Sequence, residues 1–203
     1  ILASYRHAFT QVRGAAPPDE LWLKGVGTPL MAQLRDLARS PEEVELLFQP
    51  YREFAISQHD RYIRSFDGMR RTLEGFAAAS VPMGIVTSKN RVGLQRGLHA
   101  LDLESFFSAR YTIDDSEHHK PHPQPVELAM AALSARPETT LFVGDSLHDL
   151  EAGRAAGVTT AAALWGPFDR EQLAAGQPDH WLEHPTELLG LFGLDLGGCD
   201  ESH

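Results

Sequence analysis

The most informative stretch of this chain is Leu141-Phe-Val-Gly-Asp-Ser-Leu-His-Asp-Leu-Glu-Ala-Gly153. Leu141 to Val143 have the apolar character of a short buried strand, and Gly144 permits a sharp turn behind it. Asp145 then leaves the carboxyl end of a strand, which is where open α/β sheets bind ligands. Mg²⁺ prefers oxygen ligands and usually takes one or two carboxylates together with a substrate phosphate and water. The stretch therefore predicts a site for magnesium and phosphate.

Two carboxylates in this stretch have distinct expected roles. Asp145 suits a direct metal ligand. Asp149 follows about one helical turn later, where it can hold a metal-bound water or a neighbouring lysine. The alternative is that Asp145 or Ser146 merely caps the following helix, whose first turn carries Asp149 and Glu151.

Two further segments favour a phosphate site. Met83-Gly-Ile-Val-Thr-Ser-Lys-Asn90 is an apolar strand ending in Thr87 and Ser88, whose hydroxyls and backbone N–H groups suit phosphoryl oxygens. Lys120 precedes a proline within His118-His-Lys-Pro-His-Pro-Gln-Pro125, so we expect it in a loop. A loop lysine is commonly a solvated surface residue, but a cation beside carboxylates and phosphate is what phosphoryl transfer needs.

In this order and spacing, these residues resemble the haloacid dehalogenase superfamily, which consists mostly of magnesium-dependent phosphatases. Its second, third and fourth motifs are matched by Val86-Thr-Ser88, Lys120-Pro-His-Pro123 and Gly144-Asp-Ser-Leu-His-Asp149. The run Asp114 to Pro123 is similar to the phosphoglycolate phosphatase and bacterial pyrophosphatase group. The resemblance covers nearly the whole chain.

The resemblance implies a fold and a set of roles. The expected fold is α/β, with a Rossmann-like parallel sheet core and a helical cap domain. The implied function is magnesium-dependent hydrolysis of a small phosphorylated metabolite through an aspartyl-phosphate. The roles it implies are orientation of the phosphoryl group by Thr87 and Ser88, charge neutralisation by Lys120, Mg²⁺ binding by Asp145 with Asp149, and substrate contact from the cap by Lys24 and Gly27.

One family motif has no counterpart in the sequence. The superfamily's nucleophile is an aspartate in a D-x-D-G-T motif at the end of an N-terminal strand, and Asp67-Gly68 lacks the strand, the earlier aspartate and the following Thr or Ser. We interpret Asp67-Gly68 as a turn at the domain junction. We expect that ~15 to 20 residues, which carry the strand and the nucleophile, precede Ile1 in the native protein; a natural pseudoenzyme is the alternative.

Other functions stay open at this stage. A haloacid dehalogenase would share the fold and the lysine without a metal, but the acidic loop from Gly144 to Asp149 argues against it. A phosphomutase would need a bisphosphate and a suitable cap, and a noncatalytic phospholigand-binding protein would fit the pseudoenzyme. The substrate could be phosphoglycolate, pyrophosphate or a sugar phosphate.

Composition indicates an ordinary globular enzyme. The 203 residues are 42% apolar and 23% charged, which is sufficient for a real core. The net charge of −10 disfavours nonspecific nucleic-acid binding, and no apolar run reaches the ~18 residues that cross a bilayer. A single cysteine, Cys199, favours a reducing compartment, so we expect a cytoplasmic monomer or homodimer without nucleic-acid or membrane partners.

The pattern divides the chain into a helical cap at 1–66, an α/β core at 67–193 and a polar tail at 194–203. The cap helices are expected at Ile1 to Val12, Thr28 to Ala38 and Pro41 to about Ile63, with Trp22 and Tyr51 in the cap core. In the core, helices are expected at Thr72 to Ala79, Val92 to Leu98, Val126 to Leu133 and Asp149 to Ala156. The expected strands are Met83 to Thr87, Tyr111 to Ile113, Thr140 to Val143 and Thr159 to Ala163. This alternation predicts a parallel sheet with right-handed crossovers.

His118, His119 and His122 cluster beside Lys120, and imidazoles can bind Zn²⁺. Zinc sites draw their ligands from a stable scaffold, whereas adjacent side chains of an extended loop point in opposite directions. A loop position near phosphate is therefore the favoured interpretation.

Overall fold

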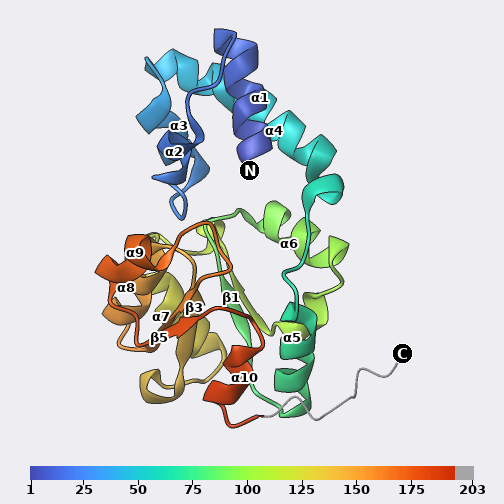
Figure 1. The fold of residues 1–203 in the computed structure, drawn as a ribbon, viewed down its shortest axis with the longest axis vertical. Coiled ribbons are helices and arrows are strands. Elements are labelled where there is room, and N and C mark those ends of the chain that lie inside the picture. The colour runs from blue at the N-terminus through green and yellow to red at the C-terminus, as the bar shows by residue number, and fades with distance from the viewer. Residues whose placement is uncertain (195–203) are drawn as a thin grey trace. The chain divides into compact units, whose positions relative to one another are not determined.

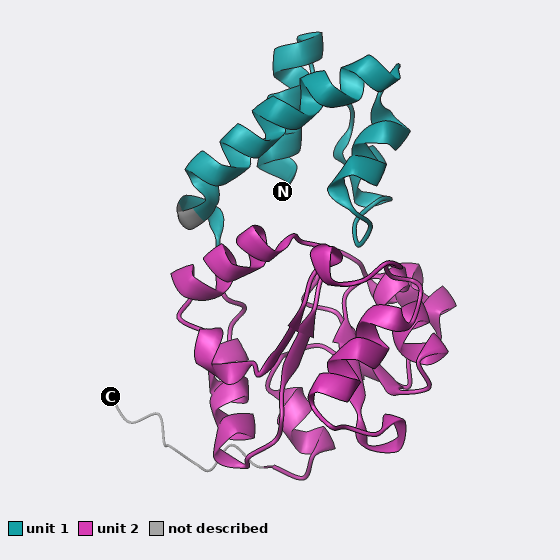
Figure 2. Cartoon of the chain, turned by 180° about the vertical axis from the view of Figure 1, so that it is seen from behind, with its two compact units in different colours: residues 1–63 teal, residues 64–203 magenta. Residues whose placement is uncertain are grey.

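The computed structural model describes residues 1–194, apart from the side chain of Asp60. The chain forms two compact units, Ile1–Ile63 and a second that begins at Arg64 (Figure 2). The sequence placed this boundary after residue 66, close to the division in the structure. Residues 195–203 of the predicted tail, with Cys199, lie outside the described residues. No helix in the described part of the chain is long and apolar enough to span a membrane.

The first unit is built from helices, labelled in Figure 1. They are α1 (Leu2–Arg13), α2 (Asp19–Leu23), α3 (Leu30–Leu37) and α4 (Pro41–Tyr62). As the sequence indicated, α4 begins after Ser40, whose hydroxyl accepts the N–H of Glu43. Helix α2 was not predicted, because five residues are too few to show a helical period.

Aromatic side chains form the core of the first unit. Tyr5, Phe9, Trp22 and Tyr51 are all buried, with Trp22 1% exposed. The Trp22 ring centroid lies 4.8 Å from that of Tyr5 and 5.5 Å from that of Tyr51. Burial raises the pKa of Tyr51 to about 12. The prediction that Trp22 and Tyr51 are core residues is confirmed.

A partly buried ion pair joins α1 to α4. The Arg13 guanidinium donates to both carboxylate oxygens of Glu43, at 2.8 and 2.7 Å, and to the carbonyl of Leu37 at 2.8 Å. The two charged side chains are only 11% and 13% exposed. Bidentate Arg–carboxylate pairs are among the stronger polar contacts, so this one should hold the last turn of α1 in place.

We expect the stability of the first unit to fall in acid through Glu43. The Arg13 hydrogen bond, with that of the Arg39 N–H, lowers the pKa of Glu43 from 4.5 to about 2. A carboxyl with a lowered pKa contributes its full stabilisation above about pH 4.5 and loses it as the pH falls toward 2. Urea unfolding at several pH values should show Glu43→Gln less stable by about 2 kcal/mol at pH 7, and the difference should become smaller in acid.

Glu45 is an exposed carboxylate of the same helix and provides the matched control. Glu45→Gln should unfold within about 0.5 kcal/mol of the wild type throughout this range. An equal effect of the two substitutions would contradict the assigned role of the Arg13–Glu43 pair.

The second unit alternates helices and strands. Its helices are α5 (Met69–Ala78), α6 (Arg91–Ala100), α7 (Gln124–Ala132), α8 (Leu147–Ala155), α9 (Arg170–Leu173) and α10 (Glu187–Leu191). Its strands are β1 (Gly84–Val86), β2 (Ala109–Tyr111), β3 (Leu141–Gly144), β4 (Thr159–Ala163) and β5 (His180–Leu182). Short 3₁₀ turns lie at Glu104–Phe106, Ile113–Asp115, Pro137–Thr139 and Ala174–Gly176.

All strand pairs are parallel, as predicted, but the strands fall into two sheets. Strand β1 pairs with β2, and β3, β4 and β5 form a second sheet in that order. Within residues 1–194, β1 and β3 are each paired along one edge only. Met83 before β1 and Val143 of β3 nevertheless pack against one hydrophobic cluster. The two sheets therefore share a core.

Helices cover both faces of the sheets, which gives the three-layer α/β arrangement seen in Figure 1. Adjacent residues of a strand face opposite sides, and β4 shows this directly. Ala161 packs in a cluster with Phe76 of α5 and Leu188 of α10, whereas Ala162 packs with Leu150 of α8. The small side chains of β4 let helices approach closely on both faces.

One predicted strand was misplaced, and three elements were missed. The strand expected at Tyr111 to Ile113 lies at Ala109–Tyr111, and Ile113 begins a 3₁₀ turn. The register Gly84↔Ala109 explains this shift, because β2 begins beside the first residue of β1. Elements α9, β5 and α10 were not predicted, since each is short and β5 carries no alternating pattern.

Candidate functional site

The acidic residues of the opening stretch lie at the carboxyl end of β3. Ser146 is the N-cap of α8. Its hydroxyl accepts the N–H of Asp149 at 3.3 Å and donates to the Asp149 carboxylate at 2.6 Å. The capping alternative therefore holds for Ser146. Asp145 makes no such cap, so its carboxylate is available for another purpose.

A buried salt bridge joins Lys120 to Asp149. The Lys120 Nζ lies 2.5 Å from Asp149 Oδ1, and the two side chains are 8% and 9% exposed. Lys120 reaches this position from the loop before α7, with a cis peptide bond to Pro121. Asp149 thus has one carboxylate oxygen on Lys120 and the other on Ser146. Of the two roles expected for Asp149, the structure shows the contact with a lysine.

Asp145 lies in a different electrostatic environment. Burial raises its pKa, the negative charge of Asp149 raises it further, and Lys120 opposes the shift. Among the described residues, Asp145 forms no salt bridge, and Lys120 pairs instead with Asp149. A partly buried carboxylate beside a second carboxylate suits one ligand of a dication.

The candidate phosphate-binding groups lie around the same lysine. Thr87, Ser88 and Lys120 line one cavity of about 10 Å³, together with Thr112 and Ser116. This is room for about one water molecule. The Ser116 hydroxyl is buried and has no partner in the described chain. The structure therefore brings Thr87, Ser88, Lys120 and Asp149 together at the carboxyl ends of parallel strands.

One part of the phosphate prediction needs correction. The backbone N–H groups of Thr87 and Ser88 were expected to bind phosphoryl oxygens, but the Thr87 N–H donates to the Tyr111 carbonyl at 2.9 Å. Two further N–H groups, at the start of α6, are also bonded. The Asn90 side chain accepts the N–H of Gly93 at 2.8 Å, and Asp114 accepts that of Arg91 at 2.8 Å. The Lys89 N–H points to Thr87 Oγ1 at 3.2 Å. The hydroxyls of Thr87 and Ser88 remain the better candidates for phosphoryl contact.

Comparison with known proteins places this site in a family. The family model of the haloacid dehalogenase-like hydrolases matches residues 1–163. The chain belongs to this family. The sequence-based assignment to the superfamily, near the phosphoglycolate phosphatase and pyrophosphatase group, is thereby confirmed, as is the α/β Rossmann-like fold.

Several relatives of this haloacid dehalogenase-like hydrolase are pyrophosphatases by name. The chain is 37% identical to pyrophosphatase PpaX of Anoxybacillus flavithermus over 194 residues, covering 96% of this chain and 89% of the relative. It is 34% identical to PpaX of Oceanobacillus iheyensis, over 95% of this chain and 89% of that one.

Solved structures share the fold. A predicted phosphoglycolate phosphatase from Haemophilus somnus matches with a TM-score of 0.85 at 20% identity, covering 94% of this chain and 89% of that one. A haloacid dehalogenase-like family hydrolase from Streptococcus pneumoniae matches with a TM-score of 0.80 at 25% identity, covering 95% and 90%.

Two glycines of this hydrolase make room for the acidic residues; the sequence indicated a turn at Gly144 but gave no sign of a role for Gly166. A Cβ at Gly144 would lie 2.1 Å from the Cβ of Asp149, and one at Gly166 would lie 2.4 Å from the Cβ of Asp145. Gly166 follows β4, so its contact with Asp145 joins the loops of two adjacent strands. The importance of Gly166 follows from its contact with Asp145 in the fold, and no local sequence pattern indicates it.

We expect Gly144→Ala to disturb the site because the new methyl group meets the Cβ of Asp149, which cannot rotate away. The helix start must shift, and the Lys120–Asp149 salt bridge lengthens. Chemical denaturation should show a loss of about 2 kcal/mol. Gly190→Ala is the control, since nothing lies within 4 Å of a Cβ there, and it should be neutral or slightly stabilising. A wild-type unfolding midpoint for Gly144→Ala would refute the close contact.

Other candidates lie elsewhere. Lys24 and Gly27 belong to the first unit, in the turn that follows α2, where Gly27 has a φ of 99°. Their role as substrate contacts stays a prediction.

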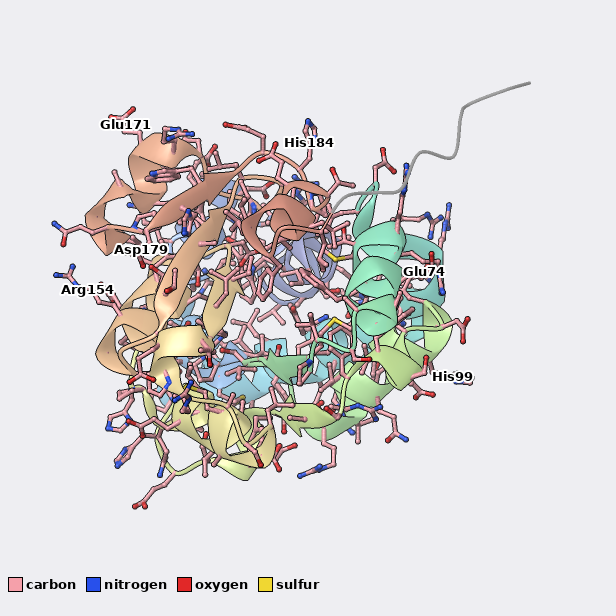
Figure 3. All side chains as sticks on the ribbon, turned by 90° about the horizontal axis from the view of Figure 1, so that it is seen from below. Glu74, His99, Arg154, Glu171, Asp179 and His184 are labelled. Atoms are coloured by element: carbon pink, nitrogen blue, oxygen red, sulfur yellow. The ribbon has the colours of Figure 1, made fainter. Side chains whose placement is uncertain are left out.

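The histidine cluster gives no metal site. The rings of His118 and His122 pack 4.4 Å apart, and His122 Nδ1 accepts the N–H of Gln124. Within residues 1–194, no group of three or more His, Cys, Asp or Glu side chains is arranged to hold a metal ion. The side chains of Glu74, His99 and Glu171 lie at the periphery of the second unit (Figure 3).

Proposed function

We propose that this haloacid dehalogenase-like hydrolase is a magnesium-dependent phosphatase acting on a small phosphorylated metabolite of the pyrophosphate or phosphoglycolate type. The observation that carries the proposal is the grouping of Lys120, paired with Asp149, and the hydroxyl-bearing turn Thr87–Ser88 around one cavity. The naming of the PpaX relatives as pyrophosphatases supports the substrate class. Composition supports a cytoplasmic enzyme without nucleic-acid or membrane partners.

Each residue of the site would have a defined task. The hydroxyls of Thr87 and Ser88 would donate to phosphoryl oxygens and fix their orientation. Lys120 would reduce the negative charge that gathers when an anionic nucleophile approaches an anionic phosphate. Asp149 would hold the Lys120 ammonium in one position through their salt bridge. Lys24 and Gly27 would contact the substrate from the cap.

The donor chemistry at β3 fits Mg²⁺. Asp145 would provide a carboxylate ligand, and Asp149 would act next to it through Lys120 and solvent. The ion would supply neutralisation of phosphate charge during the transfer. In the described chain, Asp145 is the one carboxylate assigned to the ion. Mg²⁺ commonly completes its coordination shell with substrate phosphate and water.

We further propose that the nucleophile is an aspartate outside the 203 residues, on a strand paired with the open edges of β1 and β3. These edges face no strand in the described chain, although both strands border one core. Attack by that carboxylate on phosphorus would break the bond to the leaving group, which would take a proton from a second aspartate. That aspartate would then deprotonate the water that releases phosphate. Intact mass and N-terminal sequencing of the native protein test this point. A native protein whose N-terminal residue is Ile1 would contradict it.

The reaction class can be tested with a small panel of substrates. We expect release of phosphate from pyrophosphate or phosphoglycolate in Mg²⁺, and its loss on adding EDTA. Chloride release from a 2-haloacid that persists in EDTA would instead indicate a dehalogenase. Conversion of a sugar phosphate that requires a bisphosphate would indicate a mutase. Binding of phosphate without turnover by the native protein would indicate a noncatalytic phospholigand-binding protein.

A further inference from the structure

Two loops of the second unit, one following β1 and one following β2, are bonded to each other beyond the end of their strands. The parallel register ends at Val86↔Tyr111. The Thr87 N–H then donates to the Tyr111 carbonyl at 2.9 Å, and the Ile113 N–H donates to the Lys89 carbonyl at 3.1 Å. The Thr87–Ser88 turn is thus held directly against the segment that leads to Lys120.

Side chains complete this connection. Asp114 accepts the backbone N–H of Arg91, the first residue of α6, at 2.8 Å. The Arg91 guanidinium in turn forms a salt bridge with Asp115. The second Asp115 oxygen accepts the backbone N–H of Thr112 at 2.8 Å and its hydroxyl at 2.5 Å. Every one of these bonds joins the two loops or stiffens one of them.

This group of residues borders the candidate site. Thr112 is 2% exposed and lines the cavity shared with Thr87, Ser88 and Lys120. Asp115 precedes Lys120 in the same loop, and its side chain is 14% exposed. Hydrogen bonds from Thr112 and the charge of Arg91 outweigh the opposing effect of burial and lower the pKa of Asp115. It therefore stays ionised at neutral pH, when the salt bridge is needed.

We propose that Arg91, Asp114 and Asp115 are positioning residues that hold the Thr87–Ser88 turn at a fixed place relative to Lys120. The three form a latch between the two loops, and the Lys120–Asp149 salt bridge joins the second loop to the end of β3. The latch thus connects the end of β1 to that of β2, and the salt bridge connects the end of β2 to that of β3. The inference rests on the proposed phosphatase function, because positioning matters for a reaction at these groups. A displacement of about 1 Å at a reacting group can cost about a hundredfold in rate.

Arg91 gives the most informative variants because it is 62% exposed and its removal leaves no cavity in the core. In the full-length enzyme, Arg91→Ala should lower kcat about tenfold or more with little change in the unfolding midpoint, and Arg91→Lys should recover much of the loss. Arg170→Ala is the control: Arg170 also pairs with a carboxylate, that of Glu183, and is 57% exposed. Its kcat should equal that of the wild type.

Asp114 separates the need for an acceptor from the need for charge. Its contact with the Arg91 N–H requires only an oxygen, so Asp114→Asn should keep kcat within about twofold while Asp114→Ala loses it. Equal kcat values for Arg91→Ala, Asp114→Ala and the wild type would overturn the proposal. A large loss for Arg170→Ala would do the same, because the effect would not be specific to the latch.

Hydrogen exchange provides a readout that does not depend on the proposed function. The amide of Ile113 bonds across the loops, so it should exchange faster in Arg91→Ala than in the wild type or in Arg170→Ala. Unchanged exchange would overturn the latch. If the wild type hydrolyses no phosphate ester, the proposed function fails by itself, and the exchange of Ile113 still decides whether Arg91 holds the loops together.

Discussion

Replacing Lys120 by alanine should reduce phosphate release by at least about a hundredfold, which is the largest effect we expect from a single substitution. Lys120 is the one ammonium shown to lie among the carboxylates at the end of β3, with its Nζ 2.5 Å from Asp149. Without it, charge on the phosphoryl group and on Asp149 is no longer neutralised. Steady-state kinetics of the full-length enzyme measure the loss.

The same substitution should also destabilise the fold, because it leaves the Asp149 carboxylate buried without its cation. Breaking a buried pair costs about 3 kcal/mol. Combining Lys120→Ala with Asp149→Asn should recover part of this stability and none of the activity, which separates the two effects. Arg136→Ala removes an exposed cation elsewhere in the second unit and should change neither quantity. Recovery of activity in the double variant would contradict a direct role for Lys120.

Replacing Asp145 by asparagine should also abolish most turnover, but with the opposite effect on stability. Burial and the charge of Asp149 raise the pKa of Asp145, so its ionised form is disfavoured in the fold. A carboxyl whose pKa is raised on folding makes the folded protein less stable as the pH rises from 3.8, its ordinary pKa, through its pKa in the folded state. Without metal, Asp145→Asn should therefore unfold at the same or a higher temperature than the wild type at pH 7.

Mg²⁺ should reverse the order of the unfolding temperatures of Asp145→Asn and the wild type. An ion bound by Asp145 stabilises the folded wild type in proportion to its binding, whereas Asp145→Asn should respond little. Thermal unfolding with and without Mg²⁺ gives this comparison. Asp102→Asn removes a carboxylate that is 96% exposed and should behave as the wild type does. An equal shift of the midpoint by Mg²⁺ in Asp145→Asn would remove Asp145 as a ligand.

The sequence pointed to the candidate site residues because their signal is local. An apolar strand followed by Gly144 and Asp145, or by Thr87 and Ser88, places polar groups at the carboxyl end of a strand wherever the strand lies in the sheet. Parallel pairing then brings the ends of paired strands to one edge, and the structure shows this for β1 with β2 and for β3 with β4. The predicted partnership of a lysine with Asp149 also followed from helical spacing.

What the sequence did not predict depends on neighbours distant along the chain. Gly166 matters because it lies against Asp145, and the amide of Arg91 is occupied because Asp114 comes from the loop after β2. Strand β5 has three residues and is held by β4 rather than by its own pattern. The division into two sheets likewise depends on which strands pair in the fold, and the sequence patterns of β1 and β3 do not predict it.

The central claim is tested most directly by the rate at which the purified full-length enzyme releases phosphate from pyrophosphate and from phosphoglycolate, with Mg²⁺ and again with excess EDTA. The account predicts turnover of at least one of the two in Mg²⁺, its disappearance in EDTA and its return when Mg²⁺ is restored. Turnover that is unaffected by EDTA, or no release from either substrate by protein that is folded, would contradict it.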